Sequence, residues 1–141
     1  MMISKLLTAL ALLMAQTAIA ATPDKQITCP TAAAIQYIGV VDAIEKDGPW
    51  LAKKDGSWYG VIWLNHFGTA HEWTFVVGPF IGHEAVAILK SNYALDDLKF
   101  SHDGKIGDMT KCEYYSALYR VGAAAVTPAV SPDDVLNLVR K

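Results

Sequence analysis

Residues 49–65 read PWLAKKDGSWYGVIWLN, and this stretch decides the fold that we expect. Its Asp55-Gly56 pair supplies the positive backbone angles that a tight hairpin needs. The second arm of the hairpin is apolar on both faces, with Trp58, Ile62 and Leu64 on one and Tyr59, Val61 and Trp63 on the other. A strand that is apolar on both faces is expected inside a sheet, with packing above and below it. We therefore expect the core to assemble on this strand.

The pattern on either side of the hairpin predicts a single α+β domain. Alternation of apolar residues favours strands, whereas a period of three to four favours helices. The expected elements are a helix of at most two turns over 28–35 capped by Thr28, a strand over 36–45, a strand over 72–77, a helix over 82–98, a polar segment with turns over 99–107, one long strand or two arms over 111–126 with Gly122 as a possible bulge, and a C-terminal helix over 132–141 capped by Ser131. We expect a mainly antiparallel sheet of four to six strands, packed by the 82–98 helix.

The first twenty residues have the pattern of a secretory signal peptide. Lys5 precedes an apolar run over 6–15, and Ala18-Ile19-Ala20 matches a small-residue cleavage site. The run is shorter than the roughly 20 residues that span a bilayer. The sequence predicts cleavage after Ala20 and a periplasmic or secreted location for the mature protein. A retained N-terminal anchor is the alternative.

The remaining chain divides into three parts. We expect a flexible lead over 21–28, an α+β domain over 29–126, and a linker with the short C-terminal helix over 127–141. The full chain carries a formal net charge of −2 at pH 7. Its basic residues are scattered, so the sequence predicts neither a nucleic-acid surface nor a polybasic membrane patch, and no cofactor motif is present.

The two cysteines, Cys29 and Cys112, lie near the two ends of the expected domain. In an exported chain an even number of cysteines predicts a disulfide. Neither cysteine lies in a Cys-x-x-Cys spacing that would favour redox chemistry. We expect a structural Cys29–Cys112 bridge.

A sparse pattern of residues resembles a known type of protein. Cys29-Pro30, Ile35, Trp58, Phe75 and Cys112-Glu113-Tyr114 together are similar to small exported bacterial domains of unknown function that open with Cys-Pro and close with Cys-x-Tyr. The resemblance covers most of residues 29–119. It implies a signal peptide, one disulfide and an antiparallel sheet, and it implies no reaction.

Three histidines are candidates for a metal site. His66 and His71 are expected in one loop, and His83 precedes the helix over 82–98. Zinc needs three or four ligands that converge at about 2.0–2.2 Å. No His-Glu-x-x-His motif is present. Exposed loop histidines are therefore the competing interpretation.

Nucleophilic catalysis finds little support in the sequence. No serine lies in a Gly-x-Ser-x-Gly motif. Ser101, His102 and Asp103 are contiguous, and contiguous side chains of an extended segment point to alternating sides, so we do not expect a triad.

Aromatic residues are candidates for a binding surface. Such side chains are more often part of a core, but one member of an adjacent aromatic pair must face away from the other, and an uncovered face would mark an interaction site. The candidate ligand-binding residues are Trp58, Tyr59, Trp63, Trp73 and Tyr115.

Two functions follow as hypotheses. The first is a non-enzymatic binding or interaction module for a protein, peptide or glycan, which uses an aromatic sheet face or an exposed edge strand. The alternative is a small metal-dependent hydrolase or metal-binding protein that uses His66, His71 and His83.

Overall fold

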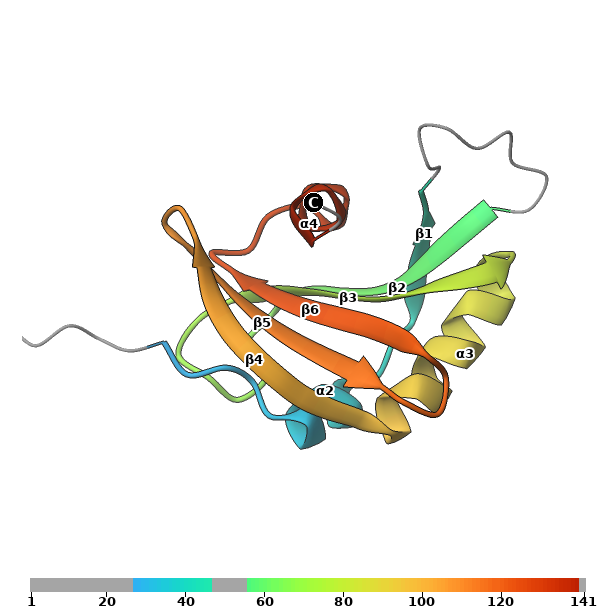
Figure 1. The fold of residues 1–141 in the computed structure, drawn as a ribbon, viewed down its shortest axis with the longest axis horizontal. Helices are drawn as coiled ribbons and strands as arrows, with labels where there is room; N and C mark the ends of the chain where they lie inside the picture. The colour runs from blue at the N-terminus through green and yellow to red at the C-terminus, as the bar shows by residue number, and fades with distance from the viewer. Residues whose placement is uncertain (1–26, 47–55, 140–141) are drawn as a thin grey trace, which may run out of the picture.

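The computed structural model describes residues 27–46 and 56–139. In chain order, these residues form α2 (Ala32–Ile38), β1 (Asp42–Glu45), β2 (Gly56–Asn65), β3 (Trp73–Gly82), α3 (Glu84–Asp96), β4 (Leu98–Ile106), β5 (Met109–Ser116), β6 (Val121–Thr127) and α4 (Pro132–Val139). The strands form one six-stranded sheet in the order β1-β2-β3-β6-β5-β4, and every neighbouring pair is antiparallel (Figure 1). The expected α+β class is confirmed.

Helices cover the sheet on two faces. Helices α2 and α3 lie on one side, and α4 crosses the other side over β3 and β6 (Figure 1). The larger core lies between the sheet and the first pair of helices, where Trp73, Phe75 and Val77 of β3 are fully buried. A smaller core lies under α4, which packs Val135 and Leu136 onto the sheet. Burial on both faces makes β3 the best-covered strand.

The hairpin that was expected to organise the core lies one strand away from its centre. Its second arm is β2, but β3 and β6 are the middle pair of the sheet. β2 is buried over Tyr59–Ile62 and then exposes Trp63 and Leu64. The expectation that the core assembles on this strand was therefore only partly right, since its apolar end faces solvent. The first arm of the hairpin and its Asp-Gly turn lie wholly or partly outside the described residues.

The strand expected over 36–45 is replaced by two elements. α2 continues to Ile38, and its N-cap is Thr31 rather than Thr28, with the Thr31 hydroxyl accepting the Ala34 N–H at 3.1 Å. The chain between α2 and β1 is held by Asn92 of α3. The Asn92 side chain accepts the Val40 N–H at 2.9 Å and donates to the Val40 carbonyl at 2.8 Å. These two bonds keep Val40 on α3, so that β1 begins only at Asp42.

Most of the polar segment over 99–107 is a strand, so the turn expected at Asp103-Gly104 is absent, whereas the turn expected at Gly107 is present. β4 pairs along its length with β5, and most of its side chains are exposed. Charged residues are typical of an edge strand, because its side chains need no burial and they discourage pairing with another chain. The stretch over 111–126 forms two strands, β5 and β6, and not one long strand. Gly122 pairs regularly with Gly78 and Tyr115, so it is no bulge.

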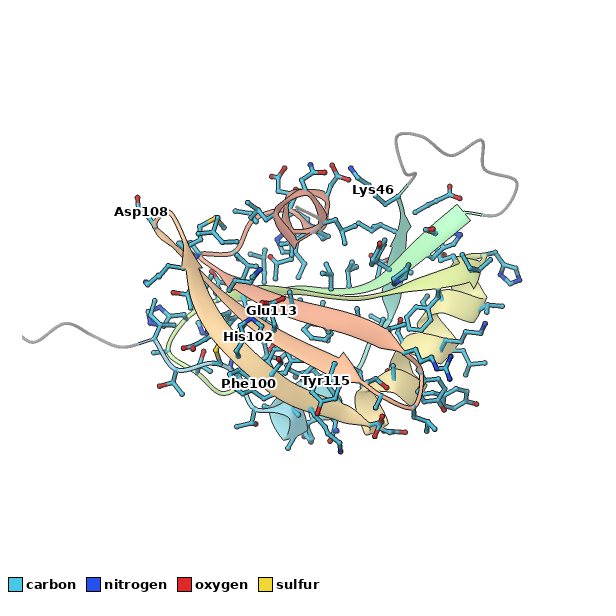
Figure 2. All side chains as sticks on the ribbon, in the orientation of Figure 1. Lys46, Phe100, His102, Asp108, Glu113 and Tyr115 are labelled. Carbon is cyan, nitrogen blue, oxygen red and sulfur yellow. A yellow bond between two sulfur atoms is a disulfide. The ribbon has the colours of Figure 1, made fainter. Side chains whose placement is uncertain are left out.

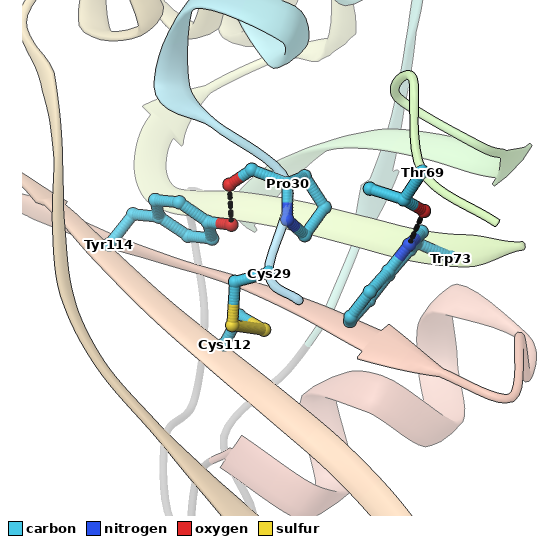
Figure 3. The surroundings of a disulfide bond; sticks show 6 residues. All are labelled: Cys29, Pro30, Thr69, Trp73, Cys112 and Tyr114. Atoms are coloured by element: carbon cyan, nitrogen blue, oxygen red, sulfur yellow. Dashed lines mark hydrogen bonds between the residues drawn. A yellow bond between two sulfur atoms is a disulfide. The ribbon is translucent and has the colours of Figure 1, made fainter. Parts of the chain in front are cut away.

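The disulfide joins the N-terminal segment to the sheet (Figure 3). Cys29 and Cys112 are bonded, with their Cα atoms 5.8 Å apart, which confirms the expected pair. Beside them the buried Tyr114 hydroxyl donates to the Pro30 carbonyl, and burial raises the pKa of Tyr114. Two bonds thus fix residues 29–30 on β5.

The expected helices over 82–98 and 132–141 are both present, as α3 and α4. Ser131 caps α4, because its hydroxyl accepts the Asp134 N–H at 3.2 Å. The Lys46 ammonium lies 2.9 Å from the Asp133 carboxylate and ties β1 to the start of α4. This ion pair links α4, which lies over β3 and β6, to the end of β1.

Candidate functional site

The three candidate metal ligands do not come together. His66 and His71 flank Thr69 in the β2–β3 connection, where the Thr69 hydroxyl oxygen lies 2.8 Å from the His66 carbonyl oxygen and 3.1 Å from that of His71. His83 is the N-cap residue of α3, at the far end of β3. The ten residues of β3 separate His71 from His83 by about 30 Å at the ordinary strand rise. The described residues contain no group of three or more His, Cys, Asp or Glu side chains that could hold a metal ion.

A β-bulge overturns the argument that separated Ser101 from His102. Phe100 pairs with Tyr114 and His102 with Glu113, so β4 has one extra residue at Ser101. A bulge of this kind re-aims side chains and ends strict alternation. The Ser101 hydroxyl is 2.9 Å from His102 Nδ1, and His102 Nε2 is 2.5 Å from the Glu113 carboxylate. Figure 2 shows His102 and Glu113 side by side on β4 and β5.

This hydroxyl–imidazole–carboxylate chain lies on an open surface. The His102 side chain is 64% exposed, and Lys111 also approaches Glu113 at 3.5 Å. The surface of the described residues has three hollows, which are described below, and neither Ser101 nor His102 lines any of them. General-base catalysis requires a substrate held within hydrogen-bond reach of the base. We therefore describe the contacts among Ser101, His102 and Glu113 as surface interactions at the edge of the sheet, and we assign them no reaction.

The five candidate aromatic residues do not form one platform. Trp73 is fully buried, and its indole N–H donates to the Thr69 hydroxyl at 2.7 Å. Tyr59 is buried, and the Trp58 indole nitrogen is enclosed without a bonding partner among the described residues. Only Trp63 and Tyr115 are strongly exposed. Trp63 belongs to β2 and Tyr115 to β5. These two strands are three strand spacings, or about 14 Å, apart in the sheet.

The exposed Trp63 lies where β2 continues beyond its neighbour. β1 pairs with Trp58–Val61, so the end of β2 has a strand, β3, on one side only. A second irregularity follows: Ile62 pairs with Phe75 and Asn65 with Trp73, so that Trp63 and Leu64 face a single residue of β3. Leu64 has a φ of 57°, a left-handed conformation that is uncommon for leucine. The bulge leaves Trp63 54% and Leu64 53% exposed.

An apolar hollow adjoins this bulge. It has a volume of about 510 Å³ and lies between β1, β2, the end of α2 and the first residues of α4. Its apolar lining comes from Ile38, Val41, Ile44, Val61, Ile62, Trp63 and Pro132. Val41 is 85% exposed, although it is β-branched and apolar. Exposed apolar residues that are contiguous, rather than scattered, mark interaction sites.

The polar lining of this hollow is acidic. Within residues 27–46 and 56–139, Asp42 and Asp133 are the only charged residues that line it. Asp133 is paired with Lys46, whereas the Asp42 carboxylate accepts the Ala43 N–H at 2.9 Å and has no ion-pair partner among the described residues. We name the hollow and its rim the β2-end site, made of Ile38, Val41, Asp42, Ile44, Val61, Ile62, Trp63, Ser131, Pro132 and Asp133, together with Gly39.

Of the β2-end site, the sequence predicted Trp63 alone. Ile38 and Val41 were expected in a regular strand, where alternation would have buried one of the two faces. Asn92 diverts this part of the chain instead, and nothing in local sequence predicts a contact across 52 residues. The only available signal was that Ile38 to Val41 contains no polar side chain.

Two further hollows lie elsewhere on the sheet. One, of about 250 Å³, lies beside α4 over the small residues Gly78, Gly122 and Ala124. The other is broad and lies between residues 27–32 and β4. Thr110 lines it, and its buried hydroxyl has no hydrogen-bond partner among the described residues. Both have fewer exposed apolar side chains than the β2-end site.

Comparison with models of protein families, with curated proteins and with solved structures found no match. The resemblance to Cys-Pro domains therefore stays a prediction from residues. Across residues 27–46 and 56–139, no helix has the length and apolar character needed to cross a membrane.

Proposed function

We propose that the protein is an exported binding module that docks an apolar group of a protein or peptide partner in the β2-end site. The observation that carries this proposal is the exposed end of β2, where a bulge presents Trp63 beside the exposed Val41. Tryptophan is enriched among the residues that dominate binding energies. A hollow with an apolar lining and few polar groups is typical of a ligand site.

A protein or peptide partner fits this surface better than a glycan. The lining is mainly aliphatic, and aliphatic side chains pack on apolar groups. A glycan platform would use several exposed aromatic rings, whereas Trp63 and Tyr115 lie on separate strands. A metal-dependent reaction finds no support in the arrangement of His66, His71 and His83.

Export to the periplasm or beyond is part of the proposal. The signal-peptide pattern of residues 1–20 supports it, although those residues lie outside the described part of the chain. The Cys29–Cys112 disulfide supports it too, because such bonds persist in oxidising compartments.

The experiment is a selection of random peptides on the purified protein, followed by measurement of each selected peptide against Trp63→Ala. We expect peptides rich in apolar residues whose affinity falls at least tenfold in Trp63→Ala and is retained in Tyr115→Ala. Tyr115 is the matched control, since it is also an exposed aromatic strand residue. Peptides that bind Trp63→Ala as tightly as the unaltered protein, or a failure to select any, would refute the proposal.

A further inference from the structure

The β2-end site combines an aromatic ring with a carboxylate that has no ion-pair partner in the described part of the chain. Asp42 pairs with Val61 across β1 and β2, and Trp63 lies two residues further along β2. Residues related in this diagonal way have Cα atoms about 7–8 Å apart, within reach of a long side chain. Both residues line the same hollow. A group bound in it would therefore touch the ring and the carboxylate together.

The charge of the site favours a cation. Among the residues that the structure describes, only Asp42 and Asp133 are charged members of its lining, and Lys46 neutralises Asp133. Asp42 remains as a negative charge at the edge of an apolar surface. A cation near the face of a tryptophan ring is also attracted by the ring itself.

We propose that the β2-end site takes a lysine or arginine side chain of an extended partner segment, with its methylene groups on Val41 and Trp63 and its charge at Asp42. This inference rests on the proposed function. Long basic side chains are suited to such a place, because their stems cover apolar surface while the charged end stays near water. Neutral apolar side chains would fill the hollow and leave Asp42 without a partner.

The test is a titration of the purified protein with three short peptides, followed by calorimetry and by tryptophan fluorescence. The peptides differ at one central residue, which is lysine, norleucine or glutamate between two leucines. Norleucine keeps the stem of lysine and removes the charge. We expect the lysine peptide to bind about fivefold more tightly than the norleucine peptide, the effect of a partly exposed charge pair. The glutamate peptide should bind most weakly.

Two variants locate the effect. Asp42→Asn should abolish the preference for lysine and leave the norleucine peptide unaffected. Asp108→Asn is the matched control, because Asp108 is an exposed carboxylate in the β4–β5 turn, at the opposite side of the sheet (Figure 2). Raising the salt concentration from 50 to 500 mM, roughly a threefold shorter screening length, should weaken the lysine peptide alone.

The outcomes separate this inference from the proposed function. If the lysine and norleucine peptides bind equally, or if Asp42→Asn keeps the preference for lysine, then the inference of a cation site is wrong. The proposal that the protein is a binding module is retained in that case. If none of the three peptides binds, or if Trp63→Ala binds them all unchanged, then the proposed function fails and the inference fails with it.

Discussion

At the scale of single residues, Tyr114 decides how the N-terminal segment is held. Its ring contacts Phe75 and Phe100 edge-on, with ring centroids 6.2 and 5.6 Å apart. Its hydroxyl donates to the Pro30 carbonyl, next to the disulfide (Figure 3). The pKa of Tyr114 is raised because burial penalises the phenolate. A single side chain thus joins core packing to the position of residues 29–30.

Tyr114→Phe should lower the free energy of unfolding by about 1–2 kcal/mol at pH 8, since the Pro30 carbonyl loses its donor. The pKa of Tyr114 is higher in the folded than in the unfolded chain, so its stabilising effect is complete below about pH 10 and is lost above it. The difference between the two proteins should therefore shrink between pH 8 and pH 11, as measured by urea unfolding. Tyr115→Phe, which alters the exposed neighbour, should change stability by less than about 0.5 kcal/mol. A difference that stays constant with pH would contradict this account.

At the scale of elements, α3 approaches β2 closely because the residue opposite it is a glycine. A Cβ atom added at Gly60 would lie 2.2 Å from the Ser91 hydroxyl oxygen and 2.7 Å from the Ser91 Cβ. Ser91 is itself fully buried in α3. The pair sets the distance between the helix and the sheet, and through α3 it sets the place of Asn92, which diverts Val40.

Gly60→Ala should destabilise the protein by about 1–3 kcal/mol, the range for overpacked cores. Gly104→Ala is the control, because a Cβ at Gly104 meets nothing within 4 Å. Adding Ser91→Gly to Gly60→Ala should recover part of the loss, although a glycine inside a helix itself costs about 1 kcal/mol. Urea unfolding of the unaltered protein, Gly60→Ala, Ser91→Gly and the double variant gives the coupling between the two positions. Equal effects at Gly60 and Gly104 would show that the close approach is not limiting.

At the scale of the whole molecule, the Cys29–Cys112 disulfide closes a loop across nearly the entire domain. The two cysteines are 83 residues apart. The link restricts the unfolded chain far more than a local bridge would. It also fixes the segment that precedes α2, since Tyr114 and Cys112 hold it on β5.

Replacing both cysteines by serine should lower the free energy of unfolding by as much as about 4.5 kcal/mol, the chain-entropy value for a loop of this length. The comparison is urea unfolding of the two proteins with and without reductant. Reductant should destabilise the unaltered protein to the level of the double variant and leave the variant unchanged. A loss below about 1 kcal/mol would show that the unfolded chain is not restricted by the bridge.

Local chemistry alone determined much of the fold. The apolar runs of β2 and β3, the helical period over 82–98, the Ser131 cap and the even number of cysteines each depend on neighbours in sequence, so the α+β class and the disulfide followed from them. Burial or exposure of an apolar strand depends on what covers it. For this reason the sequence could not place β3 and β6 at the centre, or show that β4 is an edge strand.

Only the tertiary structure decided the β2-end site and the histidine and serine placements. The side chains of Ile38, Val41 and Trp63 are exposed because Asn92 diverts Val40 and because β2 bulges at Leu64. A bulge likewise joins Ser101 to His102, and the length of β3 separates His71 from His83. Each of these depends on strand register and long-range contacts, which are set by the packing of the whole chain and not by the residues on either side.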